Sequence, residues 1–534
     1  MNDARLSVTC MMLFLAFNSP AHAEEFYVSV GESIQMAIND ASPGDTIILE
    51  TGTHEADLST ERDGEPTEPI TIKGDGEGEA ILTSDGEVLQ VDHSHWRIEG
   101  LIFDGQYGSA DTIDINDDAH FLVMSNVEVR RSGRDCIDMG DPSYVQIENS
   151  RIHHCLYYDE DTEEAEEAHG ITGGAVQNLR IVNTDIHTFS GSGIQIDPGR
   201  TAPGWNNVTV DNCRIWQLPL SETTHGFPEG IRPGKNAIDT KTPTGGERSA
   251  LTITDSEMWG FKDSTDFADQ AALLFWDNVD VTVSRTHIHD SSMAIRVRRP
   301  VESRPEGAQV RVVNSLFHDV SIGVQYARDI ESLTLQHITM GLGVDMALEA
   351  SDEDAEPPTI QNSLFLGDTL PEVAASGSNG TASTDDFIDA EGGDYHLSAT
   401  SSAIDAGELI VDIETDFDGA TRNQGEAPDW GAFEFNHPSD DTGETDDTGT
   451  SIDTGVPTDT DTDTDTDTDT DTDTDTGIAS DTGGAVDTTE SGIGAAESVG
   501  EKGGCGCSQP TGRGFIHWPF LALLATLLSM RRQD

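Results

Sequence analysis

The chain has 534 residues, of which 100 are Asp or Glu and 28 are Lys or Arg, so its formal net charge is −72 at pH 7. A protein this acidic lacks the broad basic surface that nucleic-acid binding requires, and we expect no nucleic-acid partner. The length suits a large body with its own core, and we expect that body to be a monomer.

Residues 1–23 have the organisation of a secretory signal peptide. Arg5 precedes an apolar run from Val8 to Phe17, and Ala21-His22-Ala23 matches an A-x-A cleavage site. The sequence therefore predicts an exported protein whose mature chain begins near Glu24.

Residues 24–94 combine a short helix with extended strands. Ser33–Ala41 is amphipathic, with Ser33 placed to cap the helix, and Thr46–Leu49 follows as a strand. We interpret this segment as an N-terminal cap with the first coils, because open strand ends that are left uncovered invite association.

Residues 95–370 contain a repeat whose pattern is apolar, any, Asn-like, any, any, apolar. The centres lie 23 to 43 residues apart, and a stack of β coils tolerates such variation because insertions go into turns. The recurring Asn predicts an amide ladder that pairs polar groups which would otherwise be buried without partners. The centres are Gly100, Asn126, Asn149, Asn183, Asn212, Asp255, Arg285, Asn314, His337 and Asn362.

Each repeat carries a second short strand further along the chain. A coil of three short strands and three turns, stacked in parallel, accounts for the pattern, so the predicted fold class is all-β. The second strands are Ile113–Ile115, Ile137–Met139, Gly170–Thr172, Ile194–Ile196, Ile238–Thr240, Leu273–Phe275, Ile295–Val297 and Val324–Tyr326.

This organisation resembles the right-handed parallel β-helix of the pectate-lyase-like superfamily over roughly residues 26 to 366. Four long excursions border the second strands: Leu156–Ala168, Pro198–Asn206, Gln217–Lys235 and Pro243–Arg248. Long loops along one face of a solenoid usually build the walls of a cleft, and we expect these to do so.

Residues 371–437 change character and resemble the closing modules that follow β-helices in bacterial surface proteins. Asp416 and Asp418 form a DxDG pattern that suits a turn or a calcium site. Residues 438–502 are rich in alternating Asp and Thr, and they predict an extended, disordered linker because they contain too little apolar surface for a core.

Residues 503–534 contain Cys505 and Cys507, an apolar run from Phe515 to Met530 and two terminal arginines. This tail resembles the C-terminal sorting signals of myxobacterial-type surface proteins, and the alternative is a plain transmembrane tail anchor. Either interpretation predicts attachment to a membrane at the cell surface, with release by cleavage left open.

Three cysteines fall inside the coils. A disulfide between Cys136 and Cys155 is one alternative, and the sequence does not decide the state of either residue or of Cys213. A second regularity concerns aromatic side chains at one position of the repeat, which favours packing over metal binding. These are His153, His187, Trp216, Trp259, His289 and His318.

Aligned in register, the second strands predict two columns of outward side chains. One column contains Asp138, Gln195, Asp239 and Arg296. The other contains Asp197, Lys241, Trp276 and Arg298, with Asp197 and Lys241 as direct neighbours.

The resemblance implies that this face carries an active site for β-elimination from an acidic polysaccharide. Lys241 is then the base, Arg296 and Arg298 bind substrate carboxylates, and calcium lowers the barrier to removal of the C5 proton. The remaining implied contacts are Trp276, Asn236 and Gln195 for substrate, and Asp197, Asp239 and Asp138 for calcium. No other cofactor is expected.

Two alternatives stay open. The chain lacks the consecutive-Asp calcium motif of the Lys-dependent pectate lyases and the full Asn, Glu, Lys, Arg set of the alginate and chondroitin lyases. In the alternative interpretation, Lys241 forms a cross-coil ion pair with Asp197, and the protein is a non-catalytic glycan-binding or adhesive surface protein.

Overall fold

The structure is a computed structural model that describes residues 23–159, 162, 164–198, 204–241, 248–262, 270–300 and 306–436. All of these belong to one compact unit, residues 1–442. The predicted signal peptide, apart from Ala23, the Asp/Thr-rich linker and the Cys-containing tail lie outside the described residues. The described residues contain no helix suited by length and hydrophobicity to a membrane span.

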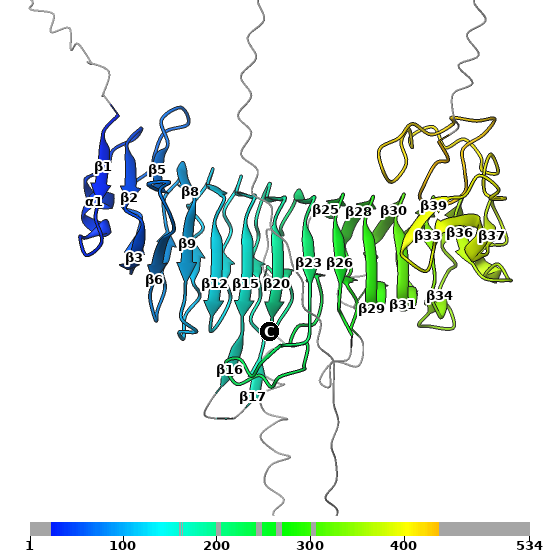
Figure 1. Cartoon of the computed structure of the whole chain (residues 1–534), viewed down its shortest axis with the longest axis horizontal. Helices are drawn as coiled ribbons and strands as arrows, with labels where there is room; N and C mark the ends of the chain where they lie inside the picture. Colours follow the sequence, from blue (N-terminus) through cyan, green and yellow to red (C-terminus); the bar gives the residue numbers. More distant parts are fainter. Residues whose placement is uncertain are drawn as a thin grey trace, which may run out of the picture. The chain divides into compact units, whose positions relative to one another are not determined.

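The described unit is a parallel β-helix with three sheets, and Figure 1 shows its strands standing side by side as the colour runs from blue to yellow. Sheet 1 is a single row of thirteen parallel strands. Its strands are β1 (Glu25–Val28), β2 (Thr46–Leu49), β5 (Ile70–Gly74), β8 (Trp96–Glu99), β11 (Val123–Ser125), β14 (Gln146–Glu148), β19 (Arg180–Val182), β22 (Val208–Asp211), β25 (Ser249–Thr254), β28 (Val279–Ser284), β30 (Gln309–Val313), β32 (Ser332–Gln336) and β35 (Thr359–Gln361).

Sheet 2 follows sheet 1 in each coil, after the turn that holds the repeat's central residue. Its strands are β3 (Gly52–Glu55), β6 (Ala80–Thr83), β9 (Leu101–Asp104), β12 (Glu128–Ser132), β15 (Arg151–Cys155), β20 (Asp185–Phe189), β23 (Arg214–Trp216), β26 (Glu257–Trp259), the first parts of β29 (His287–Val297) and β31 (Leu316–Tyr326), β33 (Thr339–Met340), β36 (Leu364–Leu366) and β37 (Gly380–Ala382).

Sheet 3 contains the second strands of the sequence pattern. They are β4 (Leu58–Ser59), β7 (Leu89–Val91), β10 (Ile113–Ile115), β13 (Ile137–Met139), β18 (Ile171–Gly173), β21 (Ile194–Ile196), β24 (Ile238–Thr240), β27 (Leu273–Phe275), the last parts of β29 and β31, and β34 (Met346–Ala350). The predicted register is confirmed from Thr172 through Gln195 and Asp239 to Leu274 and Arg296, although β18 begins one residue later than predicted.

The core follows from the alternation within these strands. In β24, for example, Ile238 is fully buried and points inward, as do Ile194 and Ile295 on neighbouring strands. Each such isoleucine contributes about 1.5–3 kcal/mol by leaving water. Stacked coil on coil, these side chains form one continuous hydrophobic cluster from Val28 to Ala374.

The recurring Asn has a conformational reason that differs from the predicted one. All nine centres from Asn126 to Asn362 have positive φ, between 45° and 54°. Asn183 Nδ2 donates to Asn149 Oδ1 at 2.6 Å and Asn212 Nδ2 donates to Asn183 Oδ1 at 3.2 Å, so the amide ladder is present. These three side chains are exposed, however, so they do not rescue buried polar groups. Asn recurs because it tolerates the left-handed conformation that turns the chain into sheet 2.

The N-terminal segment contains α1 (Ile34–Asp40), whose N-cap is Ser33, as predicted. The Ser33 side chain accepts a hydrogen bond from the Met36 backbone at 3.3 Å. Ile34 and Ile38 of the helix are buried in the same cluster as the first coils.

The C-terminal module is tied to the coils through a buried arginine. The Arg422 guanidinium is 3% exposed and donates to Asn314 Oδ1 at 2.8 Å and to Glu434 Oε2 at 3.3 Å. Asn314 in turn donates to the Thr415 carbonyl at 2.7 Å. Buried ions need such partners, since burial alone disfavours their charge.

The structure decides the state of the three cysteines, which the sequence left open. Cys136, directly before β13, forms a disulfide with Cys155 at the end of β15. Cys213 is a buried free thiol, and burial raises its pKa to about 12. The disulfide links two neighbouring coils beside sheet 3.

We predict that Asn183→Gly is more stable to urea than Asn183→Ala by about 1 kcal/mol, because only Ala pays the steric cost of positive φ. Both variants lose the same amide bonds, so their difference isolates the backbone. Thr209 on β22 is the control, and there Gly should be the less stable of the Gly and Ala pair. Equal stabilities of the two Asn183 variants would contradict the conformational explanation.

Candidate functional site

The candidate site lies on the outer face of sheet 3, across β21, β24, β27 and β29. The alternation of these strands turns Gln195, Asp239 and Arg296 outward in one column. The second column continues the ladder past the strand ends, as shown by Lys241 N, which donates to the Ile196 carbonyl at 2.7 Å. The predicted residues from Gln195 to Arg298 are therefore brought to one face.

Lys241 forms its ion pair within its own strand. Its Nζ lies 2.6 Å from Asp239 Oδ2. Asp197 follows Ile196 as Lys241 follows Thr240, so the register places the two residues on neighbouring coils, as predicted. Lys241 and Asp239 are two positions apart and point to the same side of β24, which brings the short carboxylate directly under the amine. Asp239 is 3% exposed; burial raises its pKa, while the adjacent Lys241 ammonium opposes that shift.

Trp276 organises the cations of the site. Its Nε1 donates to Asp239 Oδ1 at 3.1 Å. The Arg298 Cζ lies 4.0 Å from the ring centroid, and Lys241 Nζ lies 5.5 Å from it. An aromatic face attracts such cations through its quadrupole. Stacking of Trp276 on a sugar stays a prediction, since at least part of the ring is covered by Arg298.

The other predicted substrate residues occupy different environments. Asn236 is 5% exposed and its Nδ2 donates to the Ala271 carbonyl at 2.6 Å, so it holds the turn before β24. Gln195 is half-buried between Thr172 and Asp239 in the same column. Arg296 lies between Leu274 and Gln325, one strand away from Trp276.

The three predicted calcium ligands do not converge. Asp138 accepts a hydrogen bond from the Thr172 hydroxyl, and three strand spacings, about 14 Å, separate its row from that of Asp239. Both oxygens of Asp239 already have donors, from Lys241 and Trp276. These residues together do not fit a calcium site, and no step below is assigned to calcium.

Three residues beside the site were not predicted as functional: Lys235, Glu167 and His169. Lys235 Nζ contacts the Glu167 carboxylate, and burial together with the Lys241 charge lowers the pKa of Lys235 to about 8. The Asp239 and Glu166 carboxylates favour the ammonium form and act against that shift. The sequence offered a signal for Lys235 as a site residue, because it directly precedes the segment that enters β24.

His169 is a buried, neutral neighbour of this group. Burial, aided by the Lys241 charge, lowers its pKa to about 4. Its Nδ1 accepts from the Ser192 backbone at 2.7 Å, and its Nε2 lies 3.8 Å from Glu167 Oε2. The imidazole therefore fixes the wall of the site without adding charge.

Two of the predicted loop excursions pack on each other at this end of sheet 3. The first contains the antiparallel hairpin of β16 (Tyr157–Asp159) and β17 (Glu164–Glu166), which projects from the body in Figure 1. Leu220 and Phe227 of the second excursion form a small apolar cluster with Leu156. The central parts of the other two excursions lie outside the described residues.

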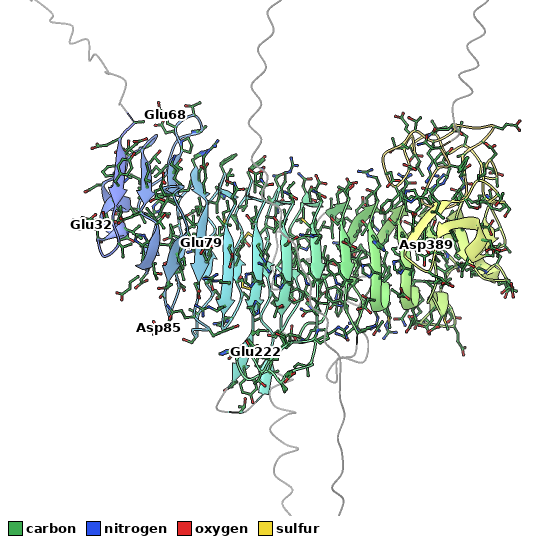
Figure 2. All side chains as sticks on the ribbon, viewed as in Figure 1. Glu32, Glu68, Glu79, Asp85, Glu222 and Asp389 are labelled. Carbon is green, nitrogen blue, oxygen red and sulfur yellow. A yellow bond between two sulfur atoms is a disulfide. The ribbon has the colours of Figure 1, made fainter. Side chains whose placement is uncertain are left out.

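The cations of the site contrast with the rest of the surface. Figure 2 shows six labelled acidic side chains spread over the described unit, and all six are exposed. They are Glu32, Glu68, Glu79, Asp85, Glu222 and Asp389. A local group of Lys235, Lys241 and Arg298 is therefore unusual on a chain of formal charge −72.

A family model described as a right-handed β-helix region matches residues 87–218 and supports the fold. No curated protein matches the sequence. Among solved structures, the pectate lyase Pel9A has 16% identity and a TM-score of 0.45, covering 77% of this chain and 96% of its own.

Two further structures are similar at the same level. An alginate lyase from Paenibacillus sp. str. FPU-7 has 17% identity and a TM-score of 0.39, covering 64% of this chain and 98% of its own. A mannuronic acid specific polysaccharide family 6 lyase from human gut microbiota has 12% identity and a TM-score of 0.43, covering 68% and 84%. At these values the likeness carries no argument about the reaction. The fold is a right-handed parallel β-helix.

We predict that Asp135→Asn makes the protein's stability less dependent on pH. Asp135, beside His169, is half-buried, and its partial removal from water raises its pKa from 3.8 to about 7. The native state thus binds this proton more tightly than the unfolded state. The resulting stability is fully present below pH 3.8 and is lost as the pH rises through about 7.

Urea unfolding between pH 4 and pH 8 measures this difference. The free energy of unfolding of the wild type should fall relative to Asp135→Asn up to about pH 7 and then run parallel to it. The Asn side chain keeps the Oδ1 acceptor that Asp135 offers to the His169 backbone at 2.6 Å. Exposed Asp85 is the control, and Asp85→Asn should follow the wild type. A pH-independent difference for Asp135→Asn would contradict the prediction.

Proposed function

We propose that this β-helix acts on an acidic polysaccharide, which it binds along sheet 3 and cleaves by β-elimination. The observation that carries the proposal is the local gathering of Lys235, Lys241 and Arg298 around the buried Asp239 and the half-buried Trp276. A polyanion is the ligand class that such a group selects on an otherwise acidic protein.

Binding is assigned to the two arginines. Arg296 and Arg298 lie two positions apart on the same side of the chain, so both guanidinium groups face the ligand. A guanidinium binds a carboxylate in bidentate fashion. Arg298 also packs on Trp276, which restricts the guanidinium to one orientation. Neutralising a uronate carboxylate in this way makes the neighbouring C5 proton more acidic.

The base is assigned to Lys241. Its Nζ lies 2.6 Å from Asp239 Oδ2, and burial raises the pKa of this carboxyl. In the proposed reaction, passage of one ammonium proton to Asp239 leaves Lys241 as a neutral amine. The amine then takes the C5 proton, the C4–O bond breaks, and a double bond forms between C4 and C5. The departing oxygen takes a proton from water, and the hydroxide that remains takes the C5 proton from Lys241, which restores the neutral amine.

A non-catalytic glycan-binding surface is the second candidate. The observation that favours it is the same ion pair, since a Lys241 that stays charged binds anions and removes no proton. Under this reading Lys241, Arg296 and Arg298 supply affinity alone, and the protein serves as an adhesive or receptor for the polysaccharide.

Export to the cell surface is part of the proposal. The signal-peptide pattern of residues 1–23 supports it. The Cys136–Cys155 disulfide also supports it, because such bonds persist in oxidising compartments. Attachment of the chain through the tail at residues 503–534 rests on the sequence pattern alone.

We predict that the full chain releases unsaturated uronates from one of pectate, alginate or chondroitin, detected by ultraviolet absorbance with and without added calcium. Lys241→Met should lower turnover by about 10²–10⁴-fold, the usual contribution of a general base. Arg298→Ala should mainly raise KM. Lys262, which pairs with Asp290 away from sheet 3, is the matched control, and Lys262→Met should keep full activity.

Three outcomes revise the proposal. Loss of turnover in Lys235→Met but not in Lys241→Met moves the base to Lys235. Binding of a polysaccharide without any product, in a folded protein, supports the adhesive candidate. Neither product nor binding for any acidic polysaccharide overturns both.

A further inference from the structure

The outer face of sheet 2 carries a continuous stack of aromatic rings, one from each of six successive coils and a last one, Tyr395, from the C-terminal module. Neighbouring ring centroids lie 4.5 to 5.6 Å apart, which confirms the packing role predicted for this position. The rings belong to His153, His187, Trp216, Trp259, His289, His318 and Tyr395.

A second column runs beside the stack and alternates in charge from coil to coil. Each position pairs in register with the next, so opposite charges are neighbours. The column reads Glu128, Arg151, Asp185, Arg214, Glu257 and His287. The last residue of the column, His287, pairs with Glu257. The alternation would place an arginine at this position, but the chain has a histidine.

We propose that Glu257, His287 and His289 form a binding site for a divalent transition-metal ion of the zinc class, between β26 and β29. The three donor atoms all lie within 4.8 Å of one another, and no other such group of three occurs in the described part of the chain. This inference is independent of the proposed function.

The spacing of the donors fits a tetrahedral ion. Glu257 Oε1 lies 3.4 Å from His287 Nδ1 and 3.2 Å from His289 Nε2. An ion with bonds of about 2.0–2.1 Å in tetrahedral geometry holds its ligand atoms about 3.3 Å apart. The side chains are 38%, 22% and 22% exposed, so an ion can enter from solvent and keep one vertex for water.

A relay of hydrogen bonds orients His287 for this role. His318 Nδ1 lies 2.7 Å from Asp319 Oδ2, and His318 Nε2 lies 2.8 Å from His287 Nε2. A carboxylate only accepts, so a neutral His318 donates from Nδ1 and accepts at Nε2 from His287. The lone pair of His287 Nδ1 then faces the Glu257 carboxylate. A metal ion between these two groups satisfies both, and outer partners of this kind are typical of metal-bound imidazoles.

An equivalent position four coils earlier, at Glu128, serves as a comparison within the same chain. His153 Nε2 lies 3.2 Å from Glu128 Oε1, the same separation as between His289 and Glu257. Arg151 occupies the place of His287 there, and Arg130 Nη1 contacts the same Glu128 oxygen at 2.8 Å. Guanidinium groups supply the positive charge and offer no lone pair, so this position binds no metal.

The donor set also selects among metals. Two imidazoles and one carboxylate suit zinc and its neighbours, whereas calcium prefers six to eight oxygen ligands. The bound ion links β26 to β29 and so joins two adjacent coils, which predicts that it stabilises the folded state by mass action.

Zinc titration calorimetry on the chelator-stripped full chain tests the proposal. We expect His287→Ala to lose one bound equivalent of Zn²⁺, or to bind it at least about 100-fold more weakly, while His153→Ala keeps it. Zinc should raise the melting temperature of the wild type and of His153→Ala but not of His287→Ala. Calcium should not compete.

A second pair of variants tests the relay. His318→Gln keeps an acceptor for His287 Nε2 and should retain binding, whereas His318→Ala should weaken it about tenfold or more. Circular dichroism without metal establishes that each variant folds; if His287→Ala does not, Glu257→Gln replaces it. Equal zinc stoichiometry and affinity in the wild type and the site variant, or an equal loss in His153→Ala, overturns the proposal.

Discussion

The structure depends on hydrogen bonding between successive coils in a fixed register. Parallel strands about 4.8 Å apart force the same position of each coil into one straight column. A residue's chemistry is therefore set by the residues one coil before and after it as much as by its sequence neighbours. Asp239 shows this, because it meets Gln195 on one side and Leu274 on the other. The turn residues with positive φ make the register possible by bending every coil at the same place.

Three columns illustrate how one scaffold yields different surfaces. On sheet 3, the column from Asp197 to Arg298 gathers cations around Trp276. On sheet 2, aromatic rings stack and seal the coils against each other, as between Trp216 and Trp259 at 4.9 Å. The column beside the rings balances its charges until His287. Each surface results from the residue types that occupy one position of successive coils, whether the same type recurs or a different type replaces it.

The sequence predicted the fold because period-two burial and a recurring turn residue are both local signals. The inward isoleucines and the strand register could be placed before any coordinates were known. Side-chain partners within the site could not. The ion pair of Lys241 with Asp239 depends on the burial of that carboxylate and on Trp276, which donates to it. Asn236 was likewise predicted to contact substrate, but its amide donates to the Ala271 carbonyl.

The attachment of the C-terminal module has a mechanical consequence. Arg422 reaches back to Asn314, the Ala432 backbone donates to Thr339 at 2.8 Å, and the Gly431 backbone donates to the Asn362 carbonyl at 2.8 Å. A tension applied at residue 436 therefore reaches several coils at once. Without these links, the same tension would peel the last strand away one bond at a time. A coil stack held in this way resists being unzipped from its end.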